Sequence, residues 1–312
     1  MGKIAFLFSG QGSQYVGMGK DICQKYDESR KIFEIADKQL GFSLSSLCFD
    51  GENELLNKTQ NTQPAILTTS IAILEAISKY GIKPDMVAGL SLGEYSALVS
   101  NGVLDFRDAV KLVAKRGLYM QEAVPKGEGT MAAILGLDRE QVVEACKEAR
   151  VKGIVEVANY NCPGQIVIGG EIKSVDLACE LVKQKGAKRA IKLKVSGPFH
   201  TSMLKEAAQK LEKELKSVSI RNFHTPYITN VTGEYVTDKN SIKQNLTKQV
   251  MSSVYFEDTI KQMINDGVET FVEIGPGKVL SGFIRKIDKT KKTYSICDSG
   301  SLEKFIEDVK AC

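Results

Sequence analysis

The sequence predicts an α/β protein in which a small α/β unit is inserted into a larger one. Three observations lead to this prediction. An apolar run at 86–90 meets a Gly-x-Ser-x-Gly sequence and then a helical stretch. Residues 129–195 alternate between strand-like and helix-like segments in the order β-α-β-β-α-β. A chain of 312 residues, 43% of them hydrophobic, can also bury a substantial core.

The N-terminal part of the chain predicts a strand followed by helices. Residues 3–8, which are apolar after Lys3, predict a buried strand, which is followed by a glycine-rich loop and a polar helical region to about Leu40. A second helix is expected from Pro64 to Tyr80, because proline suits a first helical turn and Gly81 follows as a stop.

Ser91 stands at a predicted turn between a strand and a helix. Residues 86–90 predict the strand, and residues 92–100 predict the helix. This context is the one in which Gly-x-Ser-x-Gly exposes a nucleophilic serine on a tight turn. The next helix is expected from Asp105, as its N-cap, to about Ala123.

The middle of the chain predicts the small unit. Its β-α-β-β-α-β order is the ferredoxin-like arrangement, and glycine-rich segments bracket it. Residues 224–233 and 268–277 are strand-like and are expected to complete the sheet of the large unit. The expected boundaries are 1–126 and 199–312 for the large subdomain and 127–198 for the small one.

Charge and cysteine usage limit the classes of function. The net charge is +4, and the basic runs at 183–194 and 285–292 lack interleaved aromatic residues. Each run taken alone is typical of a solvated surface. Binding of an acidic partner protein is the first alternative, and binding of nucleic acid is the second. The seven cysteines never have C-x-x-C spacing, so we expect reduced cytoplasmic thiols and no metal site. The apolar run at the N-terminus is too short for a signal peptide or a membrane span.

A serine nucleophile needs a base, and the chain has only two histidines. His200 lies in a turn sequence where the chain re-enters the large unit, so it is the better candidate for a base that faces a cleft. His224 begins a strand-like segment, where a structural or surface role is favoured.

Two backbone amides are candidates for stabilising an oxyanion. The amide of Leu92 lies at a helix start beside Ser91, and Gln11 lies between two glycines in the loop after the first strand. A dinucleotide-binding interpretation of that loop is disfavoured, because Tyr15 stands where the third glycine of the fingerprint is needed.

A series of motifs runs from residue 6 to about residue 282: FLFSGQGSQ, GLSLGEYSAL, RGLYMQEA, GTMAAILG, NYNCPGQIVIGG, VSGPFHTSM, TNVTGE and EIGPGKVLSG. Together and in this order they resemble the malonyl-CoA:acyl carrier protein transacylases, the acyltransferase family of fatty acid and polyketide synthesis. The resemblance implies an α/β-hydrolase-like large subdomain with a ferredoxin-like insertion. It also implies transfer of malonyl from malonyl-CoA to acyl carrier protein through an ester on the nucleophile.

The resemblance assigns catalytic roles to five residues. Ser91 corresponds to the nucleophile and His200 to the base. A main-chain carbonyl, at Gln249 in this chain, orients the base in place of an acidic side chain. The backbone amides of Gln11 and Leu92 correspond to the oxyanion donors.

The resemblance also assigns the substrate contacts. Arg116 corresponds to the residue that binds the malonyl carboxylate, for which a planar guanidinium is suited. The helical pattern places Arg116 at the margin of an apolar stripe, so it can reach inward while Lys115, opposite the stripe, stays in water. Without the resemblance, a packed stem and a solvated head would be favoured. A Phe before the base, here Phe199, accompanies malonyl specificity. The expected substrate-binding residues are Arg116, Gln11, Met120 and Phe199.

The chain departs from the family pattern at two positions. Leu90 stands where the family usually has His, and Ser253 stands where it usually has Pro. We expect malonyl-CoA and acyl carrier protein as partners, no cofactor, no nucleic acid, no membrane, a monomer and a cytoplasmic location. The alternatives are a serine esterase or thioesterase, an acyltransferase dedicated to polyketide assembly, and a non-catalytic docking module for a carrier protein.

Overall fold

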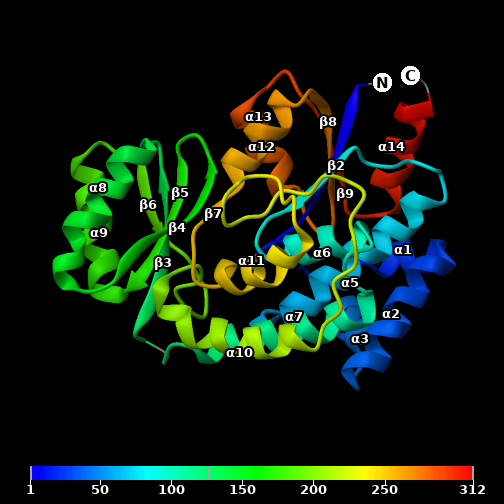
Figure 1. Ribbon diagram of the computed structural model, residues 1–312, viewed down its shortest axis with the longest axis horizontal. Helices are drawn as coiled ribbons and strands as arrows, with labels where there is room; N and C mark the ends of the chain where they lie inside the picture. The colour runs from blue at the N-terminus through cyan, green and yellow to red at the C-terminus, as the bar shows by residue number, and fades with distance from the viewer. Residues whose placement is uncertain (1, 126, 311–312) are drawn as a thin grey trace.

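The computed structural model describes residues 2–125 and 127–310. Two sheets form the framework, and they lie on opposite sides of the molecule in Figure 1. Residue 126, at the expected subdomain boundary, lies outside the described residues, as do the terminal residues 1, 311 and 312.

The first sheet has four parallel strands in the order β2-β1-β8-β9. Every residue of β1 after Lys3 is buried, as expected for a parallel strand that is covered on both faces. The strands predicted at 3–8, 86–90 and 268–277 are confirmed. The bounds are β1 (Lys3–Phe8), β2 (Met86–Gly89), β8 (Val268–Ile274) and β9 (Lys292–Ile296).

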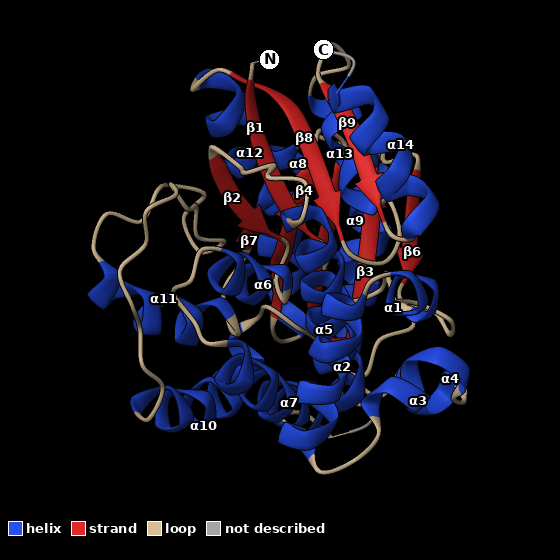
Figure 2. Ribbon diagram, turned by 90° about the vertical axis from the view of Figure 1, so that its right-hand side faces the viewer, coloured by secondary structure: helices blue, strands red, loops and turns tan. Residues whose placement is uncertain are grey.

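Helices pack against this sheet and against one another, as the strands and helices of Figure 2 show. Within 2–125 and 127–310, no helix is long and apolar enough to cross a membrane. The bounds are α1 (Lys20–Lys25), α2 (Asp27–Leu40), α3 (Leu44–Asp50), α4 (Asn53–Leu56), α5 (Thr59–Ser78), α6 (Gly93–Ser100), α7 (Phe106–Glu122), α10 (Lys205–Lys216), α11 (Ile242–Gln249), α12 (Phe256–Asn265), α13 (Val279–Ile287) and α14 (Ser299–Lys310).

Helix α5 begins earlier than its proline indicates. It starts at Thr59, so Pro64 lies inside the helix and the predicted start was wrong. The proline deprives only the carbonyl of Gln60 of its helical hydrogen bond. Helix α7 packs closely on this first turn, where a Cβ on Gly117 would lie 2.4 Å from the carbonyl oxygen of Thr59. The first turn of α5, which the local sequence does not predict, is thus in close contact with α7.

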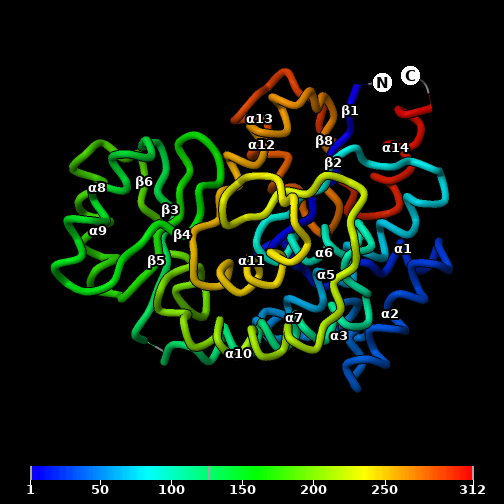
Figure 3. The backbone as a smooth tube through the Cα atoms, in the orientation of Figure 1, coloured from blue at the N-terminus to red at the C-terminus, as the bar shows by residue number. Residues whose placement is uncertain are grey.

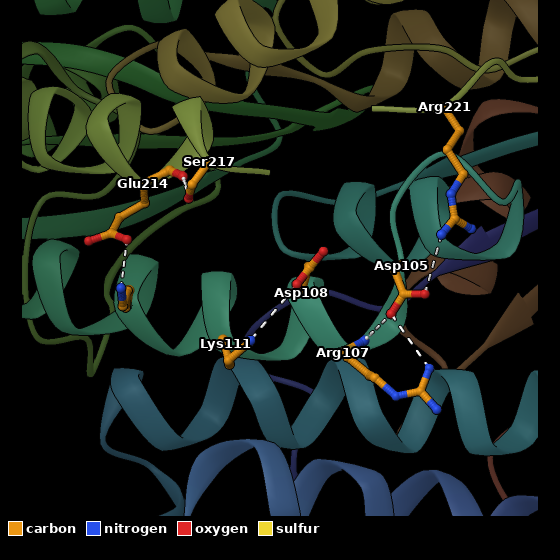
Figure 4. A network of polar contacts seen from close by, with 8 residues as sticks. Asp105, Arg107, Asp108, Lys111, Glu214, Ser217 and Arg221 are labelled. Atoms are coloured by element: carbon orange, nitrogen blue, oxygen red, sulfur yellow. Dashed lines mark hydrogen bonds and ion pairs between the residues drawn. The ribbon is translucent and has the colours of Figure 1, made fainter. Parts of the chain in front are cut away.

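Helix α7 carries the expected N-cap, which Figure 4 shows from close by. The Asp105 carboxylate accepts a hydrogen bond from the amide of Arg107 at 2.9 Å and lies 3.5 Å from the guanidinium of Arg221. Further along α7, Lys115 pairs with Glu214 of α10 at 2.6 Å. The exposed side of α7 is thus held by polar contacts, and its other side faces the core.

The second sheet has the strand order β6-β3-β5-β4-β7. Its first four strands and two helices follow the predicted β-α-β-β-α-β order, which is confirmed. Strand β7 comes from outside the expected boundaries and pairs parallel to β4 at the sheet edge. The bounds are β3 (Gly129–Leu135), α8 (Arg139–Ala149), β4 (Val155–Cys162), β5 (Gln165–Glu171), α9 (Ile172–Gln184), β6 (Arg189–Lys192) and β7 (Val254–Tyr255). Figure 3 shows the chain leaving this sheet and returning to it at β7.

Residues 224–233 do not form the predicted strand. They make only isolated bridges, in which Tyr227 lies beside Val87 of β2 and Ile228 beside Tyr235. Proline lacks the amide that a ladder needs, so Pro226 contributes only its carbonyl, which accepts from Val87. The amide of Asn230 donates to a side-chain carboxylate instead of a strand.

Gly93 is expected to tolerate no side chain. A Cβ there would lie 2.0 Å from the carbonyl oxygen of Phe8 in β1, so Gly93→Ala is expected to destabilise the protein by about 1–3 kcal/mol or more. A Cβ on Gly282 in α13 would meet no atom within 4 Å, and Gly282→Ala is expected to stabilise by up to about 1 kcal/mol. Urea unfolding of both variants checks this, and equal effects of the two changes would contradict it.

Candidate active site

Ser91 occupies a strained turn between β2 and α6. Its φ is +53°, in the left-handed region that few residues other than glycine adopt. The two flanking glycines permit the turn, since a Cβ on Gly89 would lie 2.1 Å from the carbonyl of Gly93. The side chain of Asn230 holds the turn by two hydrogen bonds. It accepts from the amide of Ser91 at 2.6 Å and donates to the carbonyl of Gly89 at 2.7 Å.

His200 lies in direct contact with the serine. Its Nε2 is 2.7 Å from Ser91 Oγ, and its Nδ1 is 2.7 Å from the carbonyl oxygen of Gln249. A carbonyl only accepts hydrogen bonds, so Nδ1 carries the proton and donates it to Gln249. Nε2 is then the free acceptor that faces the serine hydroxyl. The main-chain carbonyl thus selects the tautomer that acts as a base toward Ser91.

His200 is held as a neutral imidazole. It is buried, its φ is +61°, and its amide donates to the carbonyl of Val250 at 3.2 Å. Burial, together with the charge of Arg116, lowers the pKa of His200 from 6.5 to about 4, although backbone hydrogen bonds at Gln249 and Ser252 oppose the shift. At neutral pH the ring is therefore in the form that takes a proton.

The two expected oxyanion donors are backbone amides beside Ser91. The amides of Ser91 and Gly93 are occupied, donating to Asn230 and to the carbonyl of Leu90. Within the described chain, neither the amide of Leu92 nor that of Gln11 donates to a protein group. Unpaired amides at the start of α6 and in the loop after β1 are suited to stabilise negative charge on a bound oxygen.

Arg116 is buried. Its side chain is 1% exposed and reaches inward from the margin of α7, whereas that of Lys115 is 51% exposed, as the helical pattern predicted. Nη1 donates to Gln63 Oε1 at 2.7 Å, and Nη2 donates to Gln249 Oε1 at 2.9 Å. Nη2 also lies 3.2 Å from Ser91 Oγ. A cation therefore stands beside the nucleophile, held by neutral amide oxygens.

The guanidinium of Arg116 does not use all of its hydrogen-bond donors. Its Nε has no partner although it is buried, and the head lies 5.3 Å from the centroid of the Tyr95 ring. Burial lowers the pKa of Arg116, whereas Tyr95 and Glu94 oppose this shift. A cation without an ion-pair partner in the described chain is suited to receive an anionic group of a ligand.

A cavity of about 620 Å³ opens above Ser91. Gln11, Met120, Phe199 and His200 line it, and residues of β3, β4 and β5 close it from the other sheet. This size suits a small-molecule ligand. The structure thus brings Gln11, Met120 and Phe199 to the site as expected, whereas Leu92, Arg116 and Gln249 lie outside the lining of the cavity.

Three polar residues of this site were missed from the sequence. Gln63 holds Arg116, Asn230 holds the serine turn, and Glu94 is a fully buried carboxylate bonded to Asn230 and Gln249. A signal was present for Glu94, since it is the one charged residue in the otherwise apolar or small-residue helix 93–100. No periodicity pointed to Gln63.

The sequence also singled out His224, Leu90 and Ser253, whose positions are as follows. His224 is exposed, Leu90 lines the cavity, and Ser253 Oγ donates to the carbonyl of Val157 at 2.6 Å. Ser253 thus ties the segment after Gln249 to β4. Among the described residues, no group of three or more His, Cys, Asp or Glu side chains is placed to hold a metal ion.

Comparison with known proteins gives a consistent result. The acyl transferase domain family matches residues 5–309. The malonyl CoA-acyl carrier protein transacylase of Bacillus subtilis is 51% identical over 99% of this chain and 98% of its own length. The crystal structure of the malonyl CoA-acyl carrier protein transacylase from Clostridium perfringens is 50% identical, with a TM-score of 0.97 over 99% of this chain and 98% of that chain.

A further solved structure contains a carrier protein. It is a complex of a type II PKS acyl-carrier protein with its malonyl-transacylase. The matching chain is 40% identical, with a TM-score of 0.96 over 98% of this chain and 99% of that chain.

The pH dependence of Ser91 reactivity follows from the pKa of His200. A fluorophosphonate labels nucleophilic serines, and we expect its labelling rate to stay level from pH 8 to about pH 5. The rate is expected to fall to half near pH 4, where His200 becomes protonated and cannot accept the serine proton. Arg116→Met removes a positive charge that disfavours the imidazolium, so the midpoint is expected to rise. A midpoint near 6.5 in the unchanged protein, or a fall in the variant, would contradict this assignment.

Proposed function

The chain belongs to the acyl transferase family, and on that premise we propose that it transfers a malonyl group from malonyl-CoA to the phosphopantetheine thiol of acyl carrier protein. The observation that carries the malonyl assignment is the position of Arg116, whose Nη2 lies 3.2 Å from Ser91 Oγ. An acyl group attached to Ser91 places its far end near this guanidinium. A terminal carboxylate is the group that such a buried cation binds best.

The first step loads the enzyme. His200 Nε2 takes the proton of Ser91 as Oγ attacks the thioester carbonyl, and the amides of Gln11 and Leu92 hold the oxyanion. The C–S bond then breaks, and coenzyme A leaves with the proton that His200 returns. Malonyl remains as an ester on Ser91, with its carboxylate on Arg116.

The second step unloads the enzyme onto acyl carrier protein. His200 takes the proton of the phosphopantetheine thiol, whose sulfur attacks the ester carbonyl in the same oxyanion site. The C–O bond to Ser91 breaks, and the proton returns to the serine oxygen. The proposed reaction uses no cofactor, because the thioester is itself the activated donor.

Transfer to a thiol suits the way in which His200 is oriented. A neutral carbonyl at Gln249 stabilises an imidazolium less than a carboxylate would, and burial lowers the pKa of His200 to about 4. A thiol is more acidic and more nucleophilic than water, so it needs less help from this base. The geometry therefore favours an acyltransferase over an esterase that uses water.

We propose that the two sheets belong to two subdomains. We assign 1–126 and 199–312 to an α/β-hydrolase-like subdomain and 127–198 to a ferredoxin-like one. The strand order β6-β3-β5-β4 supports the second assignment, because these strands come from one β-α-β-β-α-β unit. A cytoplasmic location is proposed as well, and the free thiols of six described cysteines agree with it.

The covalent intermediate is expected to form on Ser91. Incubation with malonyl-CoA should give a malonyl adduct in an intact mass spectrum, and added acyl carrier protein should remove the adduct and carry the malonyl group. Ser91→Ala should abolish the adduct. An adduct that water clears as fast as carrier protein does would indicate an esterase, and no adduct in the unchanged enzyme would contradict the proposed function.

Arg116 is expected to select malonyl over acetyl. Arg116→Met keeps much of the buried volume and removes the charge, so malonyl loading should fall about 10²- to 10³-fold as the hydrogen bonds to the carboxylate are lost. Loading from acetyl-CoA should rise relative to malonyl. Rates from single-turnover mass spectrometry, with thermal unfolding as the check of folding, measure both. An unchanged ratio of the two rates would show that another residue binds the carboxylate.

A further inference from the structure

Glu94 is a buried carboxylate next to the nucleophile that the proposed steps do not use. It lies in the first turn of α6, three residues after Ser91, and is 0% exposed. All of its hydrogen-bond partners are neutral: the hydroxyls of Tyr227 and Thr229, the amide of Asn230 and the side chain of Gln249. Within the described chain it forms no ion pair with a basic side chain. Burying a carboxylate without partners would be costly, and the four donors around Glu94 offset that cost.

Glu94 is one of the groups that determine which way the amide of Gln249 points. The Nε2 of that amide lies between Glu94 Oε2 and the carbonyl oxygen of Ser91, which is 3.0 Å away. Both neighbours only accept hydrogen bonds, so the NH₂ group must face them. The Oε1 of Gln249 is thereby turned toward Arg116 Nη2, at 2.9 Å. Without the carboxylate, only the Ser91 carbonyl and the Arg116 guanidinium would fix the orientation of the amide, so the two orientations would differ less in energy.

The orientation of Gln249 matters because Arg116 has no anionic partner in the described chain. A flipped amide would place N–H groups against the N–H groups of the guanidinium and push the cation away from Ser91. A carboxylate in direct contact with Arg116 would hold the cation as well, but it would occupy the donors that a substrate carboxylate needs. Gln249 separates the two charges, so Arg116 is held in place while part of its hydrogen-bonding capacity remains unused.

We propose that Glu94 is a positioning residue for substrate selection: it fixes the Gln249 amide, whose Oε1 holds Arg116 beside Ser91 in a state ready to bind a carboxylate. The proposal rests on the proposed function, because malonyl is the substrate whose carboxylate Arg116 receives. Glu94 touches no reacting atom, and its effect on Arg116 passes through Gln249.

The test compares two reactions of Ser91. Malonyl loading from malonyl-CoA needs Arg116, whereas labelling by a fluorophosphonate has no carboxylate to place. In Glu94→Gln an NH₂ group replaces an acceptor and meets the surrounding donors, so malonyl loading is expected to fall about 10- to 100-fold. That fall should exceed the fall in labelling by about tenfold or more. Glu257→Gln, at another buried carboxylate, is the matched control and should leave the ratio unchanged.

A double-mutant cycle separates positioning from a merely structural role. Gln249→Met removes the amide side chain and keeps the main-chain carbonyl that orients His200. It should lower the ratio of malonyl loading to labelling by itself, and adding Glu94→Gln should lower the ratio little further, because both changes act through one contact. This variant also carries the test if Glu94→Gln fails to fold, as judged by thermal unfolding.

Three results would overturn the proposal. They are an equal fall of loading and labelling in Glu94→Gln, an unchanged ratio in Gln249→Met, and additive effects in the double variant. Each of these requires that the unchanged enzyme loads malonyl. If the unchanged enzyme forms no malonyl adduct, the proposed function fails instead, so the two failures are distinguishable.

Discussion

The hydrogen bond from His200 Nδ1 to the carbonyl oxygen of Gln249 is the interaction on which the rest of the site depends. It fixes the tautomer of the ring, so that Nε2 faces Ser91 as an acceptor. The side chain of Gln249 also holds Arg116 through its oxygen and the serine turn through its nitrogen. The end of α11 therefore sets the base, the cation and the nucleophile together, and a shift of this one residue would disturb all three.

The fold brings these groups together by close backbone approach. Glycines flank Ser91 where β1, β2 and α6 meet, and any side chain there would overlap main-chain atoms. Arg116 arrives from α7 and is held by Gln63 of α5, on which α7 packs. The second sheet closes the cavity above Ser91, and β7 links it to the chain segment just after Gln249. The reacting groups thus lie in turns that closely packed helices and strands hold in place.

The sequence predicts the strands and the serine turn well, because continuous apolar runs and a spaced glycine pair are local signals. It fails where tertiary contacts decide. The first turn of α5 lies before a proline. The segment around Tyr227 forms only isolated bridges, and Thr229 and Asn230 donate to the Glu94 carboxylate. The places of Ser91, His200 and Arg116 were expected from motifs, and the helical pattern allowed Arg116 to reach inward. A margin position on a helix does not reveal that Gln63 and Gln249 hold the guanidinium.

The tautomer of His200 is the most direct measure of this arrangement. In His224→Gln, His200 is the only histidine, so a long-range ¹H–¹⁵N NMR spectrum of the imidazole contains a single ring. The arrangement predicts a neutral ring at pH 7 with the proton on Nδ1. A ring protonated on Nε2, or an imidazolium at that pH, would contradict the role of the Gln249 carbonyl and with it the assignment of His200 as the base for Ser91.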